Sequence, residues 1–167
     1  MYFFPLHENT KLVDETCILL DTCWPKNRFA RRRKLISSPC TDLPVSIAMV
    51  KDEAVIGHYR LSESLENEKW CVVESVIISS QHRGLGLGLK LMRHCLELAA
   101  SLSMEEIFLS TKDKMGFYAK VGFVESFPVS ILSKVNLMFR GKHFLDKSQT
   151  KTPGVTWMSL KLNDDHC

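Results

Sequence analysis

The feature that most constrains this chain is a nearly unbroken apolar run at 70–79, followed after four residues by three alternating glycines, Gly84, Gly86 and Gly88. The run consists mainly of Val and Ile, which is typical of a strand buried on both faces, so we expect a central strand here. Residues 86–102 then carry apolar side chains at helical spacing and predict an amphipathic helix. The chain therefore passes from a central strand through a glycine turn directly into a helix.

Hydrophobic periodicity predicts further elements on both sides of this unit. We expect helices from Asn9 or Thr10, at 28–36 and at 115–121, and strands at 3–6, 45–51, 54–61, 107–110, 123–129 and 157–162. Residues 130–153 are polar and predict an irregular excursion. The order of elements indicates an α/β (mixed α+β) fold, with helices on the faces of a mixed sheet in a single domain over residues 1–167.

Composition narrows the class of protein. A chain of 167 residues with 45% hydrophobic and 25% charged residues can bury its own core, and it contains no apolar stretch long enough to span a membrane. Its amino terminus does not resemble a signal peptide. The six cysteines occur without CxxC, CxxH or HExxH spacing, so we expect reduced thiols, no metal, and a soluble cytosolic or nuclear protein.

The positive charge of the chain is local. Six basic residues and no acidic ones lie between Asp21 and Asp42, whereas the rest of the chain has 16 basic against 19 acidic side chains. Arg28, Arg31 and Arg32 share one helical face. Three interpretations remain open: a solvated surface helix, a nuclear-localisation or nucleic-acid patch, and a dock for an acidic substrate, which would repel a lysine-rich histone tail or a polyamine.

The glycine turn spans Gln81–Gly88 and predicts a pyrophosphate site. Its glycines allow several backbone N–H groups to converge, and the helix that follows adds its partial positive charge to that of Arg83. The spacing differs from the dinucleotide fingerprint G-x-G-x-x-G and from the Walker loop. Turn chemistry alone is the competing interpretation of such a cluster.

Two motifs together resemble the GCN5-related N-acetyltransferase (GNAT) superfamily. Gln81–Gly86 matches its acetyl-CoA signature Gln/Arg-x-x-Gly-x-Gly/Ala, and Phe117–Phe123 matches Phe-Tyr-x-Lys-x-Gly-Phe. Where the superfamily often has Asn-x-x-Ala, this chain has Thr111 and Lys114. The resemblance implies a GNAT fold with a mostly antiparallel sheet of about seven strands and about four helices, and acetyl-CoA as cosubstrate.

The resemblance also implies positions for the cofactor. Val76, Ile77 and Ile78 would pair with the pantetheine arm like an added strand, with Thr111, Phe117 and Tyr118 beside the arm and its sulfur. The pyrophosphate would be held by the backbone of Arg83, Gly84, Leu85, Gly86, Leu87 and Gly88.

Direct acetyl transfer to an amine requires a base and an acid but no enzyme nucleophile. A terminal amine has a pKa near 7.7–8.0, so a mild base suffices. Glu74, the one charge in the apolar strand, is the candidate base, directly or through water; the alternative is an outward-facing carboxylate. Tyr118 is the candidate acid, and the alternative is a buried aromatic with a satisfied hydroxyl.

A closer resemblance is to the actin-specific N-terminal acetyltransferase family, through Trp24-Pro25-x-x-Arg28-x-x-Arg31, Gly57-His58-x-Arg60-Leu61-Ser62 and Thr111-x-Asp113. It implies an acidic protein amino terminus as acceptor, actin above all. Its acidic side chains would meet Arg28, Arg31, Arg32 and Lys114, and its amine would meet Glu74 and Ser75.

Other expectations about partners accompany this resemblance. Some family members dock profilin through a proline-rich insertion, but Ser130–Pro153 contains one proline, which argues against such docking here. We expect a cytosolic monomer that binds neither nucleic acid nor membrane. A small-molecule acetyltransferase of the same fold and a non-catalytic acyl-CoA-binding or nucleic-acid-binding module remain the alternatives.

Overall fold

The computed structural model describes residues 1–37, 43–131 and 153–162. Its strands are β1 (Tyr2–Pro5), β2 (Val45–Lys51), β3 (Ala54–Glu63), β4 (Trp70–Ile78), β5 (Glu106–Thr111), β6 (Val124–Glu125) and β7 (Thr156–Lys161). Its helices are α1 (Val13–Asp21), α2 (Arg28–Ile36), α3 (Leu87–Ser101) and α4 (Met115–Val121), with 3-10 turns η1 (Thr10–Leu12) and η2 (Ser80–His82). In the described part of the chain no helix is both long and apolar enough to cross a membrane.

The seven strands form one mixed sheet in the order β1-β2-β3-β4-β5-β7-β6. Every pair of neighbours is antiparallel except β4 and β5, which are parallel. Strand β4 therefore lies in the middle of the sheet, which confirms the central strand predicted from its apolar run. The mixed α/β class, the seven strands and the four helices are confirmed as well.

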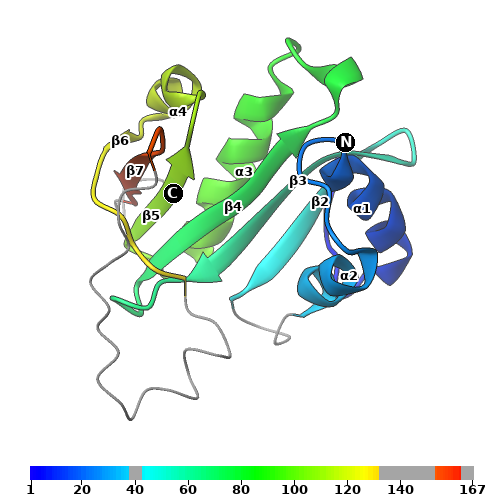
Figure 1. Ribbon diagram of the computed structural model, residues 1–167, viewed down its shortest axis with the longest axis horizontal. Coiled ribbons are helices and arrows are strands. Elements are labelled where there is room, and N and C mark those ends of the chain that lie inside the picture. The colour runs from blue at the N-terminus through cyan, green and yellow to red at the C-terminus, as the bar shows by residue number, and fades with distance from the viewer. Residues whose placement is uncertain (38–42, 132–152, 163–167) are drawn as a thin grey trace.

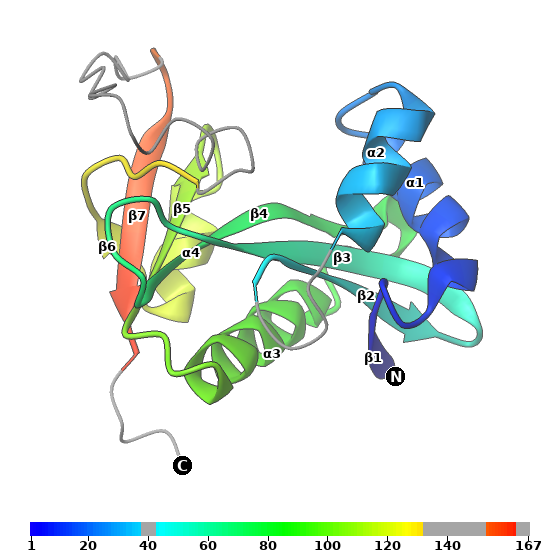
Figure 2. The same ribbon diagram turned by 90° about the horizontal axis from the view of Figure 1, so that it is seen from below.

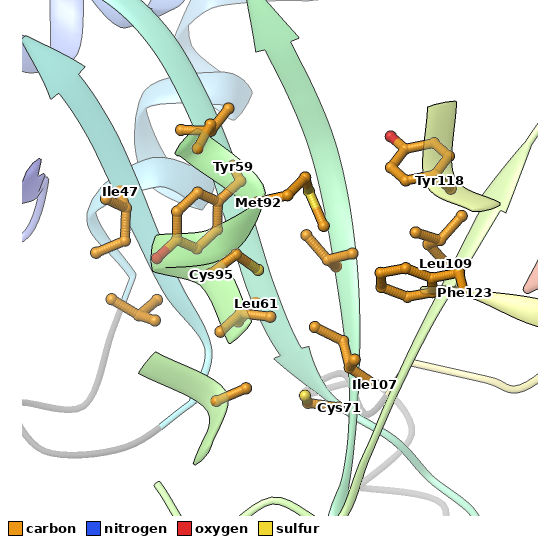
Figure 3. Packing of buried hydrophobic residues seen from close by; sticks show 14 of the residues in the cluster. Ile47, Tyr59, Leu61, Cys71, Met92, Cys95, Ile107, Leu109, Tyr118 and Phe123 are labelled. Carbon is orange, nitrogen blue, oxygen red and sulfur yellow. The ribbon is translucent and has the colours of Figure 1, made fainter. Parts of the chain in front are cut away.

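Helices cover both faces of the sheet (Figures 1 and 2). Helices α1 and α2 lie on one face and α3 on the other, with α4 next to β5. The larger core lies under α3, whose residues Leu91, Met92, Cys95 and Ala99 are fully buried. Figure 3 shows Met92 and Cys95 among Tyr59, Leu61 and Cys71 of the sheet. A second cluster joins α1 to the opposite face through Cys17, Leu20 and Ile77.

The central strand is irregular at one position. The register between β3 and β4 shifts between His58 and Arg60, so that one extra residue of β4 is accommodated there. Ser75 lies at this bulge with φ of 55°, a left-handed conformation that is uncommon for a residue other than glycine. On the other side, β4 pairs with β5 only over Trp70–Val72. Beyond these residues the two parallel strands separate and leave a gap (Figure 1).

Most predicted elements match those of the structure within two residues, but one strand is wrong. The strand predicted at 123–129 is reduced to Val124–Glu125, because Pro128 has no N–H to donate and the chain turns away after Ser126. Phe127 then packs against Trp70 and Phe108 instead. The first helix begins with the 3-10 turn η1, and Asn9 makes no capping hydrogen bond with its side chain. Residues 132–152 of the predicted excursion lie outside the described residues.

Gly57 tests how tightly β3 packs beside the bulge. A Cβ at this position would lie 2.8 Å from Ile78 Cδ1 and 3.2 Å from the Ile77 carbonyl oxygen. We expect Gly57→Ala to lower the free energy of unfolding by about 1–3 kcal/mol, measured by urea denaturation. The control is Gly116→Ala in α4, where the added methyl meets open space and should be neutral or stabilising. Equal stabilities of the two variants would contradict this account.

Candidate functional site

The loop between β4 and α3 presents a row of free backbone N–H groups. Gly84 and Gly86 adopt left-handed conformations, with φ of 78° and 74°, and Gly86 caps α3 without a side-chain hydrogen bond. In the described residues, no intrachain hydrogen bond uses the N–H groups from Gly84 to Leu89. Since α3 adds the positive end of its dipole, this loop is suited to hold a phosphate group.

Arg83 is anchored to the strand that precedes the loop. Its Nε donates to the Ile78 carbonyl oxygen at 3.1 Å, and its Nη2 lies 3.9 Å from Cys23 Sγ. The guanidinium thus holds the loop against the end of β4. It also occupies a carbonyl group that the sequence had assigned to the cofactor arm.

The gap between β4 and β5 leaves one edge of β4 available. Val76 and Ile77 follow the bulge, and past Val72 β4 has no strand partner on its β5 side among the described residues. Such an edge can form hydrogen bonds with an extended chain. The roles of Val76, Ile77 and Ile78 toward a cofactor remain predictions.

Helix α4 places aromatic side chains at the gap. Tyr118 is buried, with its ring centroid 5.0 Å from that of Phe117 and 5.9 Å from that of Phe123. Burial raises the pKa of Tyr118 to about 12, so its hydroxyl keeps its proton at neutral pH. A Cβ on Gly88 would lie 3.2 Å from the Phe117 ring, so this glycine lets α3 approach α4 closely. The Thr111 hydroxyl accepts the Lys114 backbone N–H at 3.1 Å and thereby fixes the start of α4.

A pocket opens on the other face of the sheet, between α2 and strands β3 and β4. It is lined by four cations (Lys26, Arg31, Lys34, Arg60), by His58 and Ser75, and by Leu20, Ala30 and Leu35. Helix α2 begins where the Asn27 side chain accepts the Ala30 N–H at 3.1 Å. The sequence thereby turns Arg31 and Lys34, three residues apart, toward the sheet.

The structure separates the three arginines that the sequence placed on one face. Arg31 lines the pocket and is buried, with Nε 3.0 Å from Asp21 Oδ1 and Nη2 donating to the Trp24 carbonyl. Arg28 and Arg32 instead approach Asp14 of α1, at 3.5 Å and 2.5 Å from its Oδ1. They hold the pKa of the Asp14 carboxyl below its usual value. Of the three, only Arg31 lies at the pocket.

Glu74 lies on the pocket face of β4. Its Oε2 accepts the Ser62 hydroxyl at 2.8 Å, and its Oε1 pairs with Lys34 Nζ at 3.0 Å. Lys114, by contrast, is exposed on α4 and pairs with Asp113. The structure therefore places Ser75 and Arg31 in the pocket lining and Glu74 beside its lining residue Lys34, whereas Lys114 is not among the lining residues.

Sequence reasoning assigned no role to His58 and Arg60, although both stood in a motif that it quoted. Residues 58, 60 and 62 alternate along β3 and so share a face, which is the signal that could have found them. Arg60 Nη1 donates at 2.8 Å to the Lys34 carbonyl and to Ser46 Oγ, which fixes α2 against the sheet. Fully buried His58 has its Nδ1 3.0 Å from the Ser75 carbonyl oxygen.

The cysteines of the described residues are free thiols, and three of the four are buried. Burial raises the pKa of Cys71 to about 12 and that of Cys95 well above its usual value, so neither forms a thiolate at neutral pH. In the same residues no three His, Cys, Asp or Glu side chains gather as metal ligands would. Cys40 and Cys167 lie outside the described residues.

His58 should make the stability of the fold sensitive to acid. Burial, aided by the nearby cations Arg60 and Arg31, lowers its pKa to about 4 from 6.5. Between these pH values the unfolded chain binds a proton that the folded chain does not, so stability is lost as the pH falls through this window. We expect a loss of about 3 kcal/mol between pH 6.5 and 4 that is absent in His58→Asn. Urea titrations across this range measure it, and parallel pH dependences of the two proteins would contradict it.

Residues 13–123 match the model of the acetyltransferase (GNAT) family. The chain is 28% identical over 133 residues to N-alpha-acetyltransferase 80 of Mus musculus. This alignment covers 75% of this chain and 42% of the relative. It is 39% identical over 54 residues to the probable glucosamine 6-phosphate N-acetyltransferase 2 of Oryza sativa subsp. japonica, 32% of each chain. The chain spans less than half the length of these curated relatives.

Solved structures share the fold at low sequence identity. Tetrahymena GCN5 has a TM-score of 0.68 at 15% identity, covering 98% of this chain and 97% of that one. Rv2747 of Mycobacterium tuberculosis, solved in complex with CoA and NLQ, has a TM-score of 0.67 at 19% identity, covering 92% and 96%. The family match runs from α1 to the end of α4 and includes the glycine loop and the parted strands. This protein is therefore a member of the acetyltransferase (GNAT) family, as the motifs at 81–86 and 117–123 had predicted.

Proposed function

We propose that this protein is an acetyl-CoA-dependent N-terminal acetyltransferase that acts on acidic protein amino termini, with actin as its substrate. The observation that carries the proposal is the pocket beside Glu74 and Ser75, four of whose lining residues are cations. The similarity to a mouse protein named N-alpha-acetyltransferase supports a terminal amine as acceptor. An acidic amino terminus supplies both the amine and the carboxylates that such a pocket favours.

The residues at the gap fit acetyl-CoA. The free N–H groups from Gly84 to Leu89 would bind its pyrophosphate, and the open edge of β4 after the bulge would bind its extended arm. Acetyl-CoA supplies an activated acetyl thioester when bound. A solved relative in complex with coenzyme A shares the fold, with a TM-score of 0.67 at 15% identity over 98% of both chains.

Two side chains then carry out the proton transfers. Glu74 accepts the proton that the amine loses, directly or through water, and Lys34 and Ser62 hold its carboxylate in place. Tyr118 keeps its proton at neutral pH and donates it toward the leaving thiolate. The buried thiols of Cys71 and Cys95 stay protonated, which fits a direct transfer without an enzyme nucleophile.

The cations differ in how freely they can meet a substrate. Lys26 is exposed and makes no ion pair among the described residues, so it can bind a carboxylate without breaking another contact. Arg31 is held by Asp21, and Lys34 by Glu74. We therefore assign the first acidic contact to Lys26. The assignments of Arg28, Arg31, Arg32 and Lys114 to an acidic substrate remain predictions, and each of these residues pairs with an aspartate of this chain.

A second candidate is acetylation of a small amine that carries a phosphate group. The same cations would bind the phosphate, and the similarity to a probable glucosamine 6-phosphate N-acetyltransferase over 54 residues favours this candidate.

The experiment that decides between the two candidates measures initial rates of CoA release with acetyl-CoA and four acceptors. These are a peptide beginning Asp-Asp-Asp, the same peptide with a blocked terminus, a peptide beginning Ser-Gly-Arg with an internal lysine, and glucosamine 6-phosphate. Turnover of the first peptide alone supports the proposal, and turnover of the sugar phosphate alone supports the alternative.

Lys26 provides a test of acidic recognition. We expect Lys26→Glu to lower kcat/KM for the Asp-Asp-Asp peptide by about tenfold, because it replaces an attractive charge at the pocket with a repulsive one. The matched control is Arg33→Glu, which makes the same change of charge on an exposed face of α2 that does not line the pocket. Equal losses in both variants would mean that only the net charge matters.

Tyr118 provides a test of the proton donor. We expect Tyr118→Phe to lower kcat by about 10²-fold or more, with little change in KM, because the ring still packs while the proton is gone. Single-turnover kinetics measure the rate of the acetyl-transfer step directly. An unchanged kcat would assign the Tyr118 hydroxyl a purely structural role.

A further inference from the structure

We propose that His58 Nε2 is the hydrogen-bond acceptor that holds the acceptor amine in the pocket. This inference rests on the proposed function, since it names the group that receives the amine of the substrate. It also assigns a role to a side chain outside the motifs of the cofactor site.

The hydrogen bond of His58 defines its tautomer. Nδ1 lies 3.0 Å from the Ser75 carbonyl oxygen, and a carbonyl oxygen can only accept, so Nδ1 carries the hydrogen. In a neutral ring Nε2 then bears a lone pair. The ring is neutral at physiological pH because burial and the cations around it lower the pKa of His58.

The acceptor nitrogen is left without a partner. His58 lines the pocket and is fully buried, and its Nε2 has no hydrogen-bond partner among the described residues. An unpaired buried acceptor is costly, so a ligand that supplies a hydrogen there is favoured. A carboxylate cannot do so, because it only accepts hydrogen bonds, whereas an amine can.

The pocket therefore separates the two groups of an acidic amino terminus. The carboxylates are attracted to Lys26 and Lys34, and the amine is the group that can satisfy His58. When an N–H of the neutral amine donates to Nε2, the lone pair of the amine nitrogen remains free to attack. Since Nδ1 is bonded to Ser75, the ring is fixed to the bulge from which the open edge of β4 begins.

The test separates the two nitrogens of the ring. In His58→Asn the side-chain amide can still donate to the Ser75 carbonyl from the position of Nδ1, but nothing replaces Nε2. In His58→Gln the amide reaches the position of Nε2 and its oxygen can accept. We expect His58→Asn to lower kcat/KM for the Asp-Asp-Asp peptide by about 10- to 100-fold while the Kd for acetyl-CoA changes less than twofold. His58→Gln should recover part of this loss.

A matched control distinguishes binding of the amine from damage to the fold. His94 is partly buried and accepts or donates a hydrogen bond with the Tyr59 hydroxyl at 2.8 Å, away from the pocket. His94→Asn should lower stability but leave the KM for the peptide unchanged. Full activity of His58→Asn, or an equal fall in acetyl-CoA affinity, would overturn the inference.

Imidazole ¹⁵N NMR gives a readout that does not depend on turnover. We expect a protonated Nδ1 and an unprotonated Nε2 in the free protein, with the Nε2 resonance shifting when the peptide is added in the presence of CoA.

If the wild type acetylates glucosamine 6-phosphate rather than peptides, the proposed function fails, and the same His58 variants are compared with that amine as acceptor. If it acetylates neither acceptor, the resonance decides, since a protonated Nε2, or one that neither acceptor shifts, overturns the inference.

Discussion

The site depends on the parting of two parallel strands. Strands β4 and β5 pair over Trp70–Val72 and then separate, while on its other side β4 remains paired with β3. The extra residue of β4 beside this pairing increases the local twist, which turns the end of β4 away from its neighbour. The separation leaves the β4 edge unpaired on its β5 side, and the glycine loop follows the end of β4 while α4 follows the end of β5 (Figure 1).

The bulge is also connected to the opposite face of the sheet. Ser75 adopts a left-handed conformation, and its carbonyl oxygen is within 3.0 Å of His58 Nδ1 in the pocket under α2. A strained backbone conformation persists only where its surroundings determine it, and here one such determinant is a buried side chain that also lines the pocket. One hydrogen bond therefore joins the bulge, from which the open edge of β4 begins, to the pocket under α2. This connection makes His58 a structural residue and a candidate contact of the substrate at once.

Local patterns predicted most of the fold, but they could not predict which charges meet. The limits of α2 and α4 agree with the sequence because caps and periodicity are properties of a few consecutive residues. The spacing of Arg28, Arg31 and Arg32 indicates a shared side of α2, yet Asp14 of α1 draws two of them away. His58 was missed because its hydrogen bond depends on a bulge in another strand, and the shift of register at Ser75 cannot be read from the residues of β4 alone. The short β6 was overestimated because its neighbour β7 lies about thirty residues further on, so that apolar alternation alone could not set its end.

The electrostatics of the pocket explain why an amine and acids would be recognised together. Three of its cations already have carboxylate or backbone partners, and of the four only Lys26 has neither an ion pair nor a side-chain hydrogen bond among the described residues. An ammonium group entering alone would be repelled, at about 4 kcal/mol for a unit charge 4 Å away in partly screened surroundings. Neighbouring carboxylates of the same substrate offset this repulsion, while the remaining positive field favours the neutral form of the amine, which is the nucleophile. Acidic residues at the amino terminus would therefore do more than add affinity, because they offset the repulsion between a cationic pocket and the amine that it must accept.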